Sequence, residues 1–342
     1  SCGQPSTTTS PSPGASKWPA TLTIGTKEAP STTYVVGVAT VKILGKYLKN
    51  IDSHIAAYPG VMNWPQLMKD EKLDMGQFTI HSMYDAAVGQ EYYKGQPPAT
   101  WLRIMGYGED ASLGVIAVKG KGIKTPADLK GKKWMIVRPG SDLGPRTAAA
   151  YLAAYGLKEG DVTLVKHSST DEFVSAVKEG RVDAMGWPVY PRGTPWAEEL
   201  AIGGFIEFIS DTPEAIAKIS AANPFWHAMT IPANTYKGQT SDWKTVGFSS
   251  IWGVRSTLPD DLVYAVAQAA WDNFAEWTTY HAIIKGYKLP DSAKPEMMAL
   301  PYHNGMVKYL KEKGYWTPAH ETKQNELLAT LQKAEENFKK SK

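Results

Sequence analysis

The chain contains a single cysteine, Cys2, among 342 residues. This scarcity excludes an intramolecular disulfide and any redox or zinc site built from several cysteines. Charge of one sign is not in excess either, because 37 Lys and Arg residues face 34 Asp and Glu residues. With a net charge of +3 and no basic stripe, nucleic acid is a poor partner. No apolar run approaches the roughly 18 residues that a membrane helix needs.

Motifs typical of catalysis are also missing. The seven histidines are scattered, and neither a zinc-protease histidine pair, a nucleophile elbow, nor a glycine-rich nucleotide fingerprint occurs. No two acidic residues stand out as a general acid and base. We therefore expect that the protein is not an enzyme, needs no cofactor and holds no metal ion.

What is present begins with a polar N-terminal segment. Of the first 20 residues, 14 are Ser, Thr, Pro or Gly, so the segment cannot bury enough apolar surface to fold. We expect residues 1–19 to form a flexible tether. A cysteine at the tip of such a tether is typical of a processed lipoprotein, with Cys2 as the lipid anchor; the alternative is an inert terminal cysteine.

After the tether, short apolar strands alternate with amphipathic helices. Strand-like runs occur at 22–25, 115–118, 134–137 and 162–165, the last three of the buried kind, and the apolar spacing from Val263 to Ile284 predicts one long helix. This alternation indicates an α/β fold with mostly parallel sheets. The segment 71–77 also resembles 180–186, which suggests two lobes on one plan unless the likeness is chance. Ligands of open α/β sheets bind at the carboxyl ends of strands, which places Gln77 and Trp187 near a cleft.

Three loops carry the candidate binding residues. Arg138, Gly140 and Ser141 follow a strand and precede a helix, an arrangement suited to an anion or to an ordinary N-cap turn. The first strand runs into Thr26 and Lys27 and then a Ser- and Thr-rich stretch before Tyr34, whose hydroxyls can serve a ligand or cap the helix. Rigid aromatic loops supply the remaining candidates, which could instead be packed surface residues: Asn63, Trp64, Trp187, Tyr190 and Arg192.

Four stretches together resemble the TAXI subfamily of solute-binding proteins of tripartite ATP-independent periplasmic (TRAP) transporters: 22–34, 123–141, 231–264 and 301–314. The resemblance covers about residues 20–316. It implies a two-lobe periplasmic-binding-protein fold of type II with the ligand between the lobes. Residues 20–113 and 247–342 would form lobe 1, and 114–246 lobe 2.

The resemblance also implies a function. The protein would be a monomeric receptor, periplasmic or on the cell surface, held to the membrane only by its lipid. It would capture a small organic solute, such as a carboxylate, and deliver it to a gradient-driven TRAP permease. Three alternatives stay open: a binding protein of an ATP-driven importer of the nitrate, sulfonate or thiamine-precursor type, an enzyme on the same fold, and a sensor that signals without transport.

This sequence departs from the subfamily where the ligand would lie. Its first loop carries Lys27 and Glu28 instead of glycines, and the turn before Asn63 lacks a serine. Glu28 and Asp142 could disfavour a highly anionic ligand or bind an amine. The ligand preference of the subfamily therefore does not transfer directly.

Overall fold

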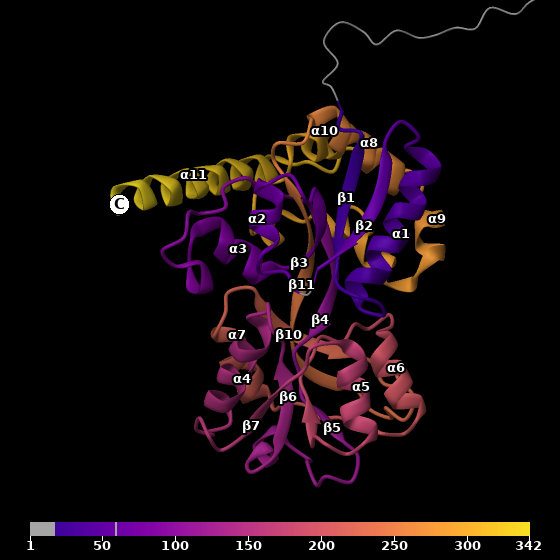
Figure 1. The fold of residues 1–342 in the computed structure, drawn as a ribbon, viewed down its shortest axis with the longest axis vertical. Helices are drawn as coiled ribbons and strands as arrows, with labels where there is room; N and C mark the ends of the chain where they lie inside the picture. Colours follow the sequence, from indigo (N-terminus) through magenta and orange to yellow (C-terminus); the bar gives the residue numbers. More distant parts are fainter. Residues whose placement is uncertain (1–17, 59) are drawn as a thin grey trace, which may run out of the picture.

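The computed structural model describes residues 18–58 and 60–342. The predicted tether, with Cys2, lies outside these residues except for its last two positions. Two β-sheets, each with its own helices, form two lobes that meet across a narrow waist (Figure 1). The predicted two-lobe α/β architecture is therefore confirmed.

Lobe 1 is built on the larger sheet, in the order β10-β11-β3-β1-β2 with β4 also paired to β11. Its strands are β1 (Thr21–Thr26), β2 (Asp52–Ala57), β3 (Met75–Thr79), β4 (Leu102–Ser112), β10 (Trp226–Ile231) and β11 (Trp243–Arg255). Its helices are α1 (Thr32–Tyr47), α2 (Trp64–Lys69), α3 (Ile80–Val88), α8 (Asp260–Trp271), α9 (Phe274–Tyr280), α10 (Asn304–Glu312) and α11 (Pro318–Lys340), with 3-10 turns η1 (Glu91–Tyr93), η3 (Ala282–Tyr287), η4 (Asp291–Ala293) and η5 (Pro295–Met297).

Lobe 2 is built on the smaller sheet, in the order β7-β6-β8-β5-β9. Its strands are β5 (Ile116–Val118), β6 (Lys133–Val137), β7 (Thr163–Lys166), β8 (Ala184–Met185) and β9 (Ile206–Phe208). Its helices are α4 (Leu143–Ala154), α5 (Thr170–Lys178), α6 (Pro195–Ile202) and α7 (Pro213–Ala221), with the 3-10 turn η2 (Pro126–Leu129).

The sheets are less parallel than the alternation predicts. β1 pairs in parallel with β2 and β3, and β6 with β7 and β8. The chain then returns in the opposite direction, so β4, β10 and β11 pair antiparallel, as do β5, β8 and β9. The long strands β4 and β11 run through the waist in Figure 1, and their pairing shifts register near Ser249 and near Trp252.

The two similar segments of the sequence occupy the same place in the two sheets. Asp74 starts β3, and its carboxylate accepts a hydrogen bond from the backbone N of Thr23 at 2.7 Å. Asp183 precedes β8, and its carboxylate accepts one from the backbone N of Lys133 at 2.9 Å. In both lobes the aspartate ties its strand to the first strand of the sheet, so the internal likeness is structural.

Two local predictions are wrong. The run 162–165 is not buried, because β7 lies at the sheet edge and Leu164 is 38% exposed. The long helix from Val263 breaks after Trp271, since the Asn273 side chain donates to the carbonyl oxygen of Ala269 at 3.0 Å and competes with the helical ladder.

Candidate functional site

A small cavity lies between the lobes and is lined from both. Lobe 1 contributes Lys27, Ser31, Thr32, Thr33, Val61, Gln77, Phe78, Thr79 and Phe248; lobe 2 contributes Ser141, Leu143, Thr170, Trp187, Pro188, Tyr190 and Trp196. About 40 Å³ of it is open to the centre of a water molecule, and one water needs roughly 10–15 Å³ by that measure. The lobes are therefore closed on a space for a few waters or a few ligand atoms.

The loop after β1 delivers a cation to this cavity. Thr33 Oγ1 accepts a hydrogen bond from the backbone N of Lys27 at 2.9 Å, and Ser31 Oγ accepts from the backbone N of Tyr34 at 3.3 Å and caps α1. The serine and threonine hydroxyls thus serve the helix while Ser31, Thr32 and Thr33 still line the cavity. The loop is fixed by these bonds, which holds Lys27 in place.

The ammonium of Lys27 is left without a carboxylate of its own. Its Nζ lies 5.1 Å from the centre of the Trp187 ring, and within residues 18–58 and 60–342 it makes no hydrogen bond or ion pair. Burial, and then repulsion from Arg138, lower the pKa of Lys27 to about 7, although the Glu28 carboxylate opposes the change. An anionic group in the cavity would supply the missing counter-charge.

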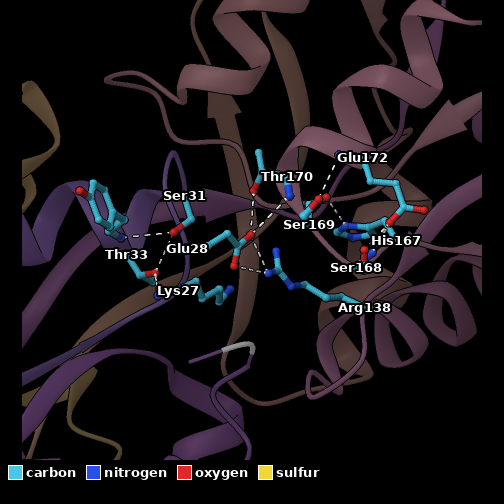
Figure 2. A network of polar contacts seen from close by, with 11 residues as sticks. Lys27, Glu28, Ser31, Thr33, Arg138, His167, Ser168, Ser169, Thr170 and Glu172 are labelled. Atoms are coloured by element: carbon cyan, nitrogen blue, oxygen red, sulfur yellow. Dashed lines mark hydrogen bonds and ion pairs between the residues drawn. The ribbon is translucent and has the colours of Figure 1, made fainter. Parts of the chain in front are cut away.

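Arg138 follows β6 and is 2% exposed. Its Nη2 donates to both carboxylate oxygens of Glu28, at 2.7 and 2.6 Å, and so joins lobe 2 to the loop after β1 in lobe 1. Figure 2 shows the Glu28 carboxylate held between Arg138 and Thr170, whose backbone N and Oγ1 both lie 3.4 Å from Oε1 at the start of α5. Burial opposes ionisation of Glu28, but the bonds from Arg138 outweigh it and lower the pKa of this carboxyl.

Two polar side chains beside the cavity have unused hydrogen-bonding groups. Gln77, on β3, is 3% exposed, and neither atom of its amide has a partner among the described residues. The buried Thr26 Oγ1 and the Nε and Nη1 of Arg138 are likewise unpartnered. Buried polar groups are normally satisfied, so these atoms point to a polar occupant or to bound water.

Trp187 forms the aromatic wall on lobe 2. The ring of His167 meets it edge-on with centroids 5.0 Å apart, and burial lowers the pKa of this histidine to about 4, so it is neutral near pH 7. The guanidinium carbon of Arg138 lies 5.8 Å from the centre of the same indole. One ring thus faces two cations, which a cation–π arrangement favours.

A second ionic contact closes the rim of the cleft. Arg146 of α4 bonds to Asp85 of α3 at 2.6 Å and to Asp142 at 2.8 Å, while Ser82 donates to Asp142 at 2.6 Å. Gly140, with φ +74°, also crosses the cleft, because its carbonyl oxygen accepts from the backbone N of Met62 at 3.4 Å. Any Cβ at Gly60 would stand 2.2 Å from that oxygen, so the close approach requires glycine there.

The structure brings together only part of the predicted site. Five of the predicted residues line the cavity: Lys27, Gln77, Ser141, Trp187 and Tyr190. Thr26, Arg138 and Gly140 lie beside it in the contacts given above. Tyr34 is half-buried on α1 and is not part of the lining.

Three predicted residues lie elsewhere. Trp64 is fully buried in lobe 1, where it packs edge-on against Phe78 with centroids 5.1 Å apart. Asn63 lines a separate hollow beside Trp101. Arg192 pairs with Glu109 at 2.6 Å in a groove next to β4 and β10.

The sequence prediction missed Thr170, Phe248 and the role of Glu28 as a bridge between lobes. A signal for Thr170 was present, since Ser168-Ser169-Thr170-Asp171 after a strand is a typical helix start, and Ser169 Oγ does accept from the backbone N of Glu172. Phe248 gives no such signal, because it lies on a strand, β11, whose two faces are both buried.

Over residues 18–58 and 60–342, no group of three or more His, Asp or Glu side chains is arranged to hold a metal ion. None of the helices in this part of the chain is long and apolar enough to span a membrane.

Solved structures of similar shape support the fold. A structure from Bordetella bronchiseptica RB50 has 19% sequence identity and a TM-score of 0.51, over 91% of this chain and 89% of that one. The alkanesulfonate-binding protein SsuA from Xanthomonas axonopodis pv. citri, bound to MOPS, has 17% identity and a TM-score of 0.45 over 92% and 85%. An ancestral arginine-binding protein bound to arginine has 18% identity and a TM-score of 0.43 over 79% and 99%.

At such identities the likeness concerns the fold alone, and the resemblance to the TAXI subfamily stays a prediction. The comparison at the level of sequence families is more specific. The sequence profile of the NMT1-like family matches residues 24–314, which is most of the chain and includes both lobes. The chain therefore belongs to the NMT1-like family.

Proposed function

We propose that the protein is an extracytoplasmic solute receptor that captures a small organic solute bearing a carboxylate between its lobes. Residues 20–113 and 247–342 would move as one lobe and 114–246 as the other. The observation that carries the proposal is the unpaired ammonium of Lys27 in a cavity lined from both lobes. A carboxylate on Lys27 would give this cation a partner and, through Trp187 and Ser141, would favour the closed arrangement.

The partner in transport follows from the same proposal. The closed receptor would present one continuous surface from both lobes to a membrane permease, for which we propose a gradient-driven TRAP type. Uptake into vesicles that hold the permease and are supplied with receptor and ligand would test this. Uptake driven by an imposed ion gradient supports it, whereas uptake that requires ATP assigns the receptor to the alternative importer.

Ligand binding is tested on refolded protein, cleared of any carried-over solute, against short carboxylates, amino acids and sulfonates. A ligand that binds only the folded state raises Tm by mass action. We expect carboxylates to raise Tm and to do so less in Lys27→Met than in the matched variant Lys158→Met, whose lysine is exposed. Equal shifts in the two variants would contradict the role of Lys27, and turnover of a bound compound would favour an enzyme instead.

A further inference from the structure

The charged groups at the cavity can be counted. Two cations, Lys27 and Arg138, face one carboxylate, Glu28. His167, which contacts Trp187, is held neutral by burial. Asp142 comes next to Ser141 in the chain, but it is paired with Arg146 at the rim. The groups at the cavity therefore leave one positive charge without a partner.

Glu28 lies where the second carboxylate of a ligand would otherwise bind. Its Oε1 is close to the backbone N of Thr170, at the N-terminus of α5, where the free N–H groups attract anions. Arg138, 98% buried, is directed at the same place and has two further nitrogens, Nε and Nη1, without partners. A buried arginine and a helix N-terminus form a built anion site, and a side chain of the protein already fills it (Figure 2).

We propose that Glu28 determines the specificity of the receptor, by occupying the anion site of Arg138 and α5 so that the cavity accepts a ligand with a single negative charge. The inference rests on the proposed function and names its substrate class, the monoanionic organic acids. A dicarboxylate would have to put its second charge next to Glu28, and like charges brought together at a desolvated site oppose binding strongly.

The charge count predicts how variants should choose between two series of probes: acetate, propionate and butyrate against malonate, succinate and glutarate. The wild type, with one unpaired cation, should prefer the monocarboxylates. Glu28→Gln keeps a carbonyl oxygen that accepts from Arg138 but leaves two unpaired cations, so it should bind dicarboxylates at least about tenfold more tightly than the wild type does. The double variant Glu28→Gln/Arg138→Met restores one unpaired cation and should return to monocarboxylates.

Two further variants serve as controls. Asp85→Asn also removes a carboxylate that bridges the lobes, but at the rim, away from the cavity. It should change the affinity for both series by the same factor and leave their ratio as in the wild type. Lys27→Met removes the unpaired cation and should lose at least about tenfold in affinity for monocarboxylates.

The affinities are measured by calorimetry or tryptophan fluorescence, with circular dichroism to verify folding. A ratio between the two series that is the same in Glu28→Gln as in the wild type overturns the inference. If neither series binds the wild type or any variant, the carboxylate claim of the proposed function fails, and the inference fails with it. Should Glu28→Gln not fold, the double variant decides: dicarboxylate binding equal to its monocarboxylate binding overturns the inference.

Discussion

Two ion pairs join the lobes, and they differ in how completely their groups are satisfied. At the rim, Arg146 bonds to Asp85 and Asp142, and Asp142 also accepts from Ser82. In the cavity, Arg138 bonds to Glu28 through Nη2 alone, while Nε and Nη1 have no partner among the described residues. The rim pair is complete without a ligand and can hold the lobes together. The inner pair retains unused donors, as a recognition site does.

The largest expected effect is the loss of the rim cation. Arg146→Met leaves Asp85 and Asp142 facing each other with side chains only 9% and 13% exposed. Removing one partner of a buried pair costs about 3–5 kcal/mol in the free energy of unfolding. Urea denaturation measures the change, with Arg181→Met as the control, because that pair with Glu179 is exposed and should contribute under about 1 kcal/mol. Equal losses in the two variants would mean that the rim pair does not hold the lobes.

A smaller effect concerns pH and the inner site. The pKa of Lys27 is lowered to about 7, so the free protein loses this positive charge as pH rises above that value. An anionic ligand requires the charged form, and the affinity for a monocarboxylate should therefore fall up to about tenfold per pH unit above pH 7, or about 1.4 kcal/mol. Calorimetry between pH 6 and 9 checks the slope, which Lys27→Met should abolish. A flat profile in the wild type would show that no lysine ammonium contacts the ligand.

The smallest expected effect is on stability, from Arg138→Met. The Glu28 side chain is 34% exposed and can be hydrated once its partner is gone, and methionine removes two buried donors that had none. We expect the free energy of unfolding to change by about 1 kcal/mol or less, although the arginine is more deeply buried than Arg146. Urea denaturation of both variants side by side makes the comparison. A greater loss from Arg138→Met than from Arg146→Met would reverse the roles of the two pairs.

Much of the fold was accessible from the sequence because it is encoded locally. The strands at 22–25 and 134–137 alternate or are uniformly apolar, and the repeated aspartates at 74 and 183 mark equivalent strand starts. Lys27, Gln77 and Trp187 were found for one reason: each follows or ends a strand that points towards the waist.

The rest of the site depends on packing, which local patterns do not record. Trp64 fits between Gly25 and Gly76, where a Cβ on either glycine would lie 3.3 or 2.7 Å from the indole, and only the folded sheet shows that small space. Arg192 was taken for a ligand contact because its loop is aromatic and rigid, yet Glu109 on the distant strand β4 neutralises it. The pairing of Glu28 with Arg138 joins residues 110 positions apart, which no spacing rule connects.

The central place of β11 has a consequence for synthesis. β11 lies between β3, β4 and β10, and it spans 243–255, so the larger sheet cannot be completed before residue 255 has left the ribosome. The parallel strands of both lobes are made earlier, and until then the edge of β3 that later pairs with β11 has open backbone groups. Domains emerge and fold from the N-terminus, and unpaired strand edges are where nascent chains associate wrongly. The growing chain thus passes through an interval in which β3 needs shielding, by a chaperone or by its own helices α2 and α3.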